Sequence, residues 1–64
     1  MIRAWCRKDH ETGDVRVVGR GYVLAQLLRE SALSRAEAER LMVANSNGRP
    51  ITLAHATYYF GGPA

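Results

Sequence analysis

Cysteine is almost absent from the sequence, and this scarcity excludes the disulfide framework that stabilises many domains of this size. The 64 residues contain one thiol, Cys6, so no internal disulfide can form. Structural zinc takes four ligands, and Cys6 with two distant histidines, His10 and His55, is a poor set for it. We therefore predict no bound metal and no other cofactor. A lone cysteine also fits a reducing compartment, which favours a cytoplasmic location.

Long apolar runs are missing as well. No stretch approaches the ~20 consecutive apolar residues that cross a bilayer, and residues 1–5 contain no apolar core of signal-peptide length. We expect a soluble, cytoplasmic protein with no membrane partner. A chain of 64 residues forms one domain, 1–64, that buries only ~60% of the surface its unfolded chain exposes.

Lysine and acidic residues are scarce relative to arginine. Nine basic side chains, eight of them arginine, outnumber six acidic ones and give a net charge of +3. A GC-rich genome would favour arginine codons whatever the function, whereas selection for the planar guanidinium would favour contacts with phosphates and carboxylates. In either case the positive charge permits contact with nucleic acid or with an acidic protein surface.

Alternation of apolar and polar residues marks the first part of the chain. It predicts one strand over Ile2–Lys8 and a second over Val15–Gly21. Thr12-Gly13-Asp14 between them supplies turn chemistry, because Gly13 can take a positive φ without steric cost. We therefore expect the two strands to pair as an antiparallel hairpin.

Helical spacing of apolar residues follows, and predicts helices over Tyr22–Ser31 and Ser34–Asn45. Ser34 with Glu37 has the spacing of a capping box. Ile51–Phe60 is rich in β-branched and aromatic residues, which predicts a third strand, with a short helix as the alternative. The expected fold is α+β: a β-hairpin followed by two helices and a third antiparallel strand, with the helices packed on one face of a small sheet.

Arginine and tryptophan side chains share one face of the predicted hairpin. The set comprises Arg3, Trp5 and Arg7 from the first strand, and Arg16 and Arg20 from the second. An aromatic platform in a basic groove binds single-stranded nucleic acid, and tryptophan and arginine are also enriched at protein–protein hot spots. With Arg35 of the second helix, these residues predict a non-catalytic contact with nucleic acid or a nucleoprotein. The alternative is that Trp5 lies in the core and that arginine stems cover apolar surface.

Leu27-Leu28, Ala32-Leu33-Ser34, Ala38 and Leu41 mark a helix, a turn and a second helix within Leu24–Leu41. This segment resembles the helix-turn-helix of bacterial and phage repressors. The resemblance implies a transcription regulator, acting as a homodimer, in which Arg35, Glu37 and Glu39 face the major groove. The alternative is an ordinary helical hairpin that covers a sheet.

A third hypothesis rests on size and composition. The chain resembles small accessory proteins of phages and mobile elements, including anti-CRISPR inhibitors that block a host protein complex, although no motif carries this resemblance. It implies protein–protein contact with a host complex. Catalysis is not expected, because Cys6 and His10 are the one pair that could act as thiolate and imidazole, and nothing marks a group to orient them.

Overall fold

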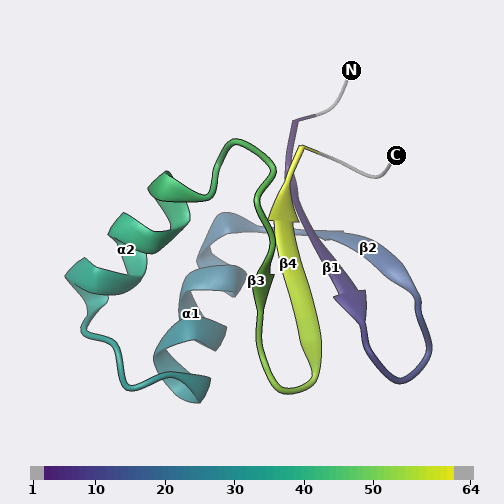
Figure 1. Ribbon diagram of the computed structural model, residues 1–64, viewed down its shortest axis with the longest axis horizontal. Coiled ribbons are helices and arrows are strands. Elements are labelled where there is room, and N and C mark those ends of the chain that lie inside the picture. The colour runs from purple at the N-terminus through teal and green to yellow at the C-terminus, as the bar shows by residue number, and fades with distance from the viewer. Residues whose placement is uncertain (1–2, 62–64) are drawn as a thin grey trace.

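The chain folds into a β-hairpin, two helices and a second β-hairpin, in that order. The computed structural model describes residues 3–61. The elements are β1 (Trp5–Asp9), β2 (Val15–Val18), α1 (Arg20–Glu30), α2 (Arg35–Ala44), β3 (Ile51–Thr52) and β4 (Ala56–Phe60). The strands form one antiparallel sheet in the order β2-β1-β4-β3, so the two hairpins meet along β1 and β4. Figure 1 shows both helices on the same side of this sheet, which confirms the predicted α+β class.

The sheet register determines which side chains face the helices. Trp5 lies opposite Val18 on one side and opposite Phe60 on the other. Arg7 lies opposite Tyr58, which in turn lies opposite Ile51. Since side chains alternate along a strand, these residues occupy one face of the sheet.

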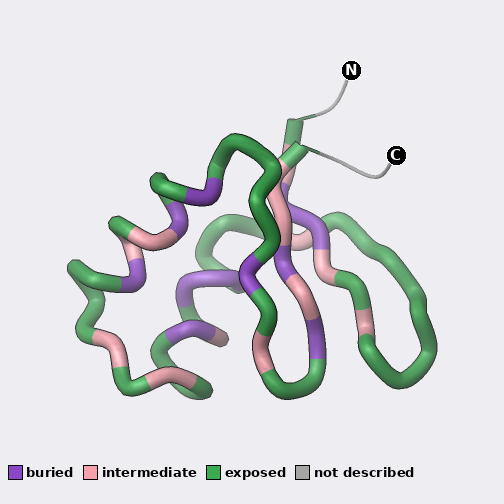
Figure 2. The backbone as a smooth tube through the Cα atoms, in the orientation of Figure 1, coloured by how far each residue is buried: buried purple, intermediate pink, exposed green. Residues whose placement is uncertain are grey.

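The core fills the space between that face and the helices. Its buried residues are Trp5, Val23, Leu24, Leu27, Ala38, Met42, Ile51, Ala56 and Tyr58. They come from both helices and three strands, and Figure 2 shows the buried segments turned toward one another. A single cluster of this size is what a domain of 64 residues can support.

Local sequence signals fix the helix ends. The N–H of Glu37 donates to Ser34 Oγ at 3.2 Å, and the N–H of Ser34 donates to Glu37 Oε1 at 2.9 Å. This confirms the predicted capping box at the start of α2. After α2, Gly48 has a φ of 97°, as a left-handed turn after a helix requires. The helix α1 begins at Arg20, two residues earlier than predicted, after an N-cap at Gly19.

The C-terminal segment differs from its prediction. Ile51–Phe60 is two strands rather than one, because the N–H of Leu53 donates to the carbonyl of Ala56 at 2.9 Å and closes a tight hairpin. No glycine, proline or asparagine marks this turn in the sequence. The turn is favoured because it lets Ile51 pair with Tyr58 over the core. At the other end the first strand begins at Trp5, whereas its predicted range began at Ile2. Ile2 lies outside the described residues, and Arg3 and Ala4 are described but do not belong to the strand.

Candidate functional site

Trp5 lies in the core and not on an exposed face. Its side chain is 6% exposed, and its ring centroid is 5.5 Å from that of Phe60. The prediction that Trp5 joins an exposed arginine surface is therefore wrong, and the alternative that Trp5 is a core residue is confirmed. Burial of the large apolar indole of Trp5 stabilises the fold more than burial of the smaller side chains on the opposite face of β1.

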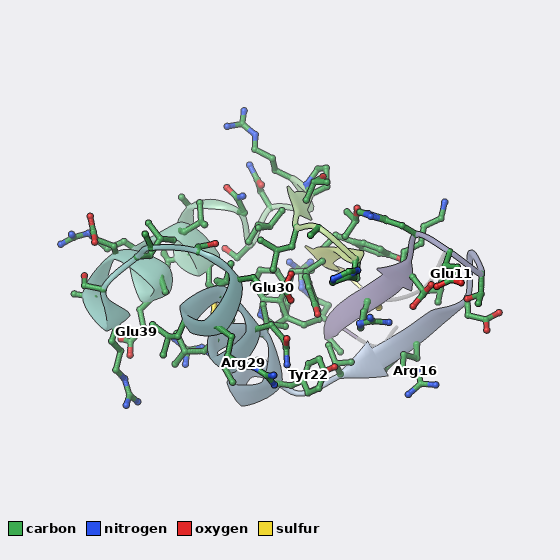
Figure 3. The ribbon with its side chains drawn as sticks, turned by 90° about the horizontal axis from the view of Figure 1, so that it is seen from below. Glu11, Arg16, Tyr22, Arg29, Glu30 and Glu39 are labelled. Atoms are coloured by element: carbon green, nitrogen blue, oxygen red, sulfur yellow. The ribbon has the colours of Figure 1, made fainter. Side chains whose placement is uncertain are left out.

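The predicted arginines do not form one surface. Arg7 and Arg16 lie opposite each other on β1 and β2. Arg35 is on α2, where its Nε donates to Glu39 Oε1 at 3.0 Å. Figure 3 shows Arg16 and Glu39 at opposite ends of the molecule. Trp5, Arg7 and Arg16 do share one face of the hairpin, as predicted, but Trp5 is buried there and Arg20 begins α1 instead of extending β2. The predicted exposed face of Arg3, Trp5, Arg7, Arg16 and Arg20 is corrected accordingly, and Arg35 lies apart from it on α2.

Arg7 is held by contacts within the fold. Its Nη1 donates to Asp9 Oδ2 at 3.1 Å, and the Tyr58 hydroxyl and Asp9 together raise the pKa of its guanidinium. The carboxylate of Asp9 also accepts the N–H groups of Thr12 and Glu11, at 3.0 and 2.8 Å. These two N–H groups, and then Arg7, lower the pKa of Asp9 to about 2. Asp9 therefore orders the β1–β2 turn and also pairs with Nη1 of Arg7, whereas Nε of Arg7 is buried without a hydrogen-bond partner among residues 3–61.

A groove runs between the start of α1 and the outer face of α2. One part is lined by Arg20, Ala36, Glu39, Arg40, Val43 and Ala44. An adjoining part, which shares Arg20 and Val43, is lined by Trp5, Arg20, Met42, Val43, Ser46 and Phe60. We call these two parts together the α2 groove. Its surface is mainly apolar, and Val43 at its centre is 68% exposed.

Arginines from separate segments border the α2 groove. Arg20 is the first residue of α1 and Arg40 lies on α2, and both side chains are exposed. Arg3 precedes β1, and its guanidinium carbon lies 5.4 Å from the centroid of the Phe60 ring, which lines the groove. The acidic residue in the lining, Glu39, is paired with Arg35. The groove thus combines positive charge at its rim with an apolar floor.

Sequence reasoning missed Arg40 and Val43, although the helical period held a signal for both. Ala38 and Met42 are the buried residues of α2, so residues 40 and 43 must lie on other sides of the helix. What the period could not show is that α1 would bring Arg20 beside them. Of the predicted site residues, Arg20 and Trp5 line the groove, and Arg3 lies against the ring of Phe60 at its edge. Arg7, Arg16 and Arg35 do not line it.

The remaining candidate groups have partners of their own. Cys6 is fully buried, with its Sγ 3.9 Å from the carbonyl of Ala4. His10 lies with Nε2 2.7 Å from Thr57 Oγ1 and Nδ1 3.3 Å from the carbonyl of Ala54. Within residues 3–61, no group of three or more His, Cys, Asp or Glu side chains could hold a metal ion. Neither helix in that range has the length and apolar character needed to cross a membrane.

Comparisons of the chain with protein-family models, with curated proteins and with solved structures found no match.

Proposed function

We propose that this protein is a non-catalytic binding protein that contacts nucleic acid, free or within a nucleoprotein, through the α2 groove. The observation that supports it is the arrangement of Arg3, Arg20 and Arg40 around one groove, although they come from three different segments. Arginine stays charged at physiological pH, and its planar fork matches phosphate oxygens. Because the carboxylate of Glu39 is occupied by Arg35, it opposes a bound phosphate only weakly.

The exposed side of α2 suits contact with bases as well as with phosphates. Arg40 can donate two hydrogen bonds to a guanine edge, and Ala36 and Val43 offer apolar contact to a thymine methyl group. Glu37, which the helix-turn-helix resemblance places at the major groove, is instead engaged in the capping box with Ser34. In this proposal Arg20 and Arg3 contact phosphates, and Arg40 lies nearest the bases.

Binding is tested with labelled duplex DNA, single-stranded DNA and RNA in fluorescence anisotropy. If Arg20 and Arg3 contact two phosphates, affinity for duplex DNA should fall roughly 12-fold between ~50 mM and ~200 mM salt. Arg20→Ala and Arg40→Ala should each weaken binding about tenfold. Arg20→Ala should also reduce the salt slope by about 1, whereas Arg40→Ala should reduce the preference for one base sequence over another. No binding to any of the three probes at the lower salt concentration would overturn the proposal.

Arg29→Ala is the matched control for Arg20→Ala. Arg29 is exposed in the last turn of the same helix (Figure 3), nine residues and therefore ~13 Å along the axis from Arg20. Both variants lose the same charge from the same element. Equal loss of affinity in the two would indicate a general effect of net charge and would contradict a site at the groove.

A second candidate is an inhibitor that blocks a host protein complex by protein–protein contact. The observation that favours it is the exposure of Val43 between small residues, Ala36 and Ala44, since exposed apolar surface at a groove is typical of protein docking. The two candidates are separated by capture from host lysate after nuclease treatment. A partner retained without nucleic acid, and lost in Val43→Asp, favours the inhibitor. In either case we place the protein in the cytoplasm, because its one thiol, Cys6, is unpaired.

A further inference from the structure

β2 is an uncovered outer strand of the sheet. In the order β2-β1-β4-β3 it pairs only with β1. Figure 1 shows the helices on the far side of the molecule from this strand, and Figure 2 shows β2 and the turn before it as exposed. Val15 and Val17 of this strand are 42% and 52% exposed. An exposed edge with apolar side chains is a ready template for pairing with another strand.

The backbone of β2 presents its unused groups at this edge. The N–H of Asp9 donates to the carbonyl of Asp14 at 2.9 Å, so residues 9 and 14 form a hydrogen-bonded pair. Hydrogen-bonded pairs alternate along an antiparallel ladder, so the next are 7 with 16 and 5 with 18. The N–H and C=O groups of Val15 and Val17 therefore point away from β1, toward the outside. No backbone bond to these groups is formed from across that edge within residues 3–61.

We propose that two copies of this chain pair through β2, antiparallel about a two-fold axis centred on Val17. A two-fold axis perpendicular to a sheet keeps each residue on its own face. At the axis, one residue must therefore lie opposite the same residue of the second copy. Centring on Arg16 would set two arginines directly opposite each other, which is destabilising. Centring on Val17 sets Val17 opposite its copy, with both outward hydrogen bonds exchanged, and sets Arg16 opposite the partner's Val18.

Charge complementarity supports a second copy as the occupant of this edge. The turn before β2 carries Glu11 and Asp14, whereas Arg20 follows its other end. Asp14 and Arg20 are each three residues from Val17, so the proposed register places the acidic end of one copy beside the basic end of the other. The four valines 15 and 17 of the two copies then form one apolar stripe, on the sheet face opposite the helices.

Val17→Pro tests the pairing directly. Proline lacks an N–H, and the N–H of Val17 is not used by β1, so this position at the free edge tolerates proline in the monomer. Sedimentation equilibrium without nucleic acid should show a monomer–dimer equilibrium for the unaltered protein below about 1 mM. Val17→Thr, which keeps the N–H and the β-branch, should still dimerise, whereas Val17→Pro should remain monomeric at the same concentrations. A wild-type protein that is monomeric up to about 1 mM would overturn the proposal.

A charge swap keeps the test decisive if Val17→Pro does not fold. Asp14→Arg and Arg20→Asp should each weaken dimerisation about two- to fivefold, and the double variant should restore it. No recovery in the double variant would contradict the proposed register. Arg20 also borders the α2 groove, and for that reason assembly is measured without nucleic acid, and loss of binding in Arg40→Ala remains an independent readout.

Discussion

At the scale of single residues, burial and hydrogen bonding decide what each charge can do. Arg7 and Arg20 are the same residue type, and both were predicted to bind a ligand. Arg7 lies half-buried against Tyr58 and donates to Asp9, whereas Arg20 is exposed beside the α2 groove. A guanidinium that is already paired gains less from a phosphate, because it must first give up its existing bonds. The guanidinium thus has a structural role at residue 7 and is available for binding at residue 20.

Asp9 makes the stability of the fold dependent on pH. Its folded pKa of about 2 lies below the ordinary value of 3.8. Its ionised carboxylate therefore contributes stability that is fully present above pH ~4 and is lost as pH falls toward ~2. Asp9→Ala should be less stable at neutral pH and should lose less stability across this window, as measured by urea unfolding followed by circular dichroism.

Asp14→Ala is the control for that measurement. The side chain of Asp14 accepts no hydrogen bond from any residue in the described range 3–61, although it belongs to the same turn. It should behave like the unaltered protein across the same pH range. If the free energy of unfolding of the wild-type protein does not change between pH ~4 and ~2, Asp9 does not stabilise the folded state.

At the scale of the elements, α2 depends on its first turn. The helix has ten residues, and isolated helices of this length are marginal in water. The capping box satisfies two backbone N–H groups at its start, those of Ser34 and Glu37. Since α2 forms one wall of the groove, a frayed first turn would displace Ala36 before it affected the sheet.

Ser34→Ala should lower the free energy of unfolding by about 1 kcal/mol, because it leaves the N–H of Glu37 without its acceptor. Ser34→Asp keeps an acceptor at the N-cap and should stay close to the unaltered protein. Both are measured by urea unfolding at neutral pH. Equal destabilisation by alanine and aspartate would indicate that the packing of Ser34, and not its cap, is what matters.

At the scale of the whole molecule, one small core supports both the sheet and the groove. Trp5 belongs to that core and also lines the inner part of the α2 groove, so fold and site share a residue. Arg20 and Arg40 border the groove from its exposed side. A change at Trp5 should therefore affect stability and binding together, whereas a change at Arg20 or Arg40 should affect binding alone.

Trp5→Ala should destabilise the fold by about 3–5 kcal/mol, which is most of the stability that a domain of this size is expected to have. Nucleic-acid binding should then be lost together with the folded circular dichroism signal. Arg40→Ala should lose binding while its unfolding curve stays unchanged. A Trp5→Ala variant that remains folded and keeps a high urea midpoint of unfolding would show that the indole is not a core residue.

The sequence by itself determined the features that depend on near neighbours. The capping box needs only Ser34 and Glu37, three residues apart. The first turn needs Gly13, whose φ is 78°. The extents of both helices follow from apolar spacing within a dozen residues, and the predicted ranges differ from the observed ones by one or two residues at each end. Local interactions of this kind are present whatever the rest of the chain does.

Tertiary structure decided the rest. Alternation along β1 defines two faces but cannot say which one the helices will cover, and a reversal of that choice moves Trp5 from solvent to core. The turn at 53–55 forms because Ile51 and Tyr58 meet over the core. No glycine, proline or asparagine within the turn predicts it from the sequence. Arg3, Arg20 and Arg40 are far apart in the chain and come to one groove only through the packing of α1 on α2 and the sheet. The candidate site is thus a product of long-range packing, which pattern in a single sequence does not encode.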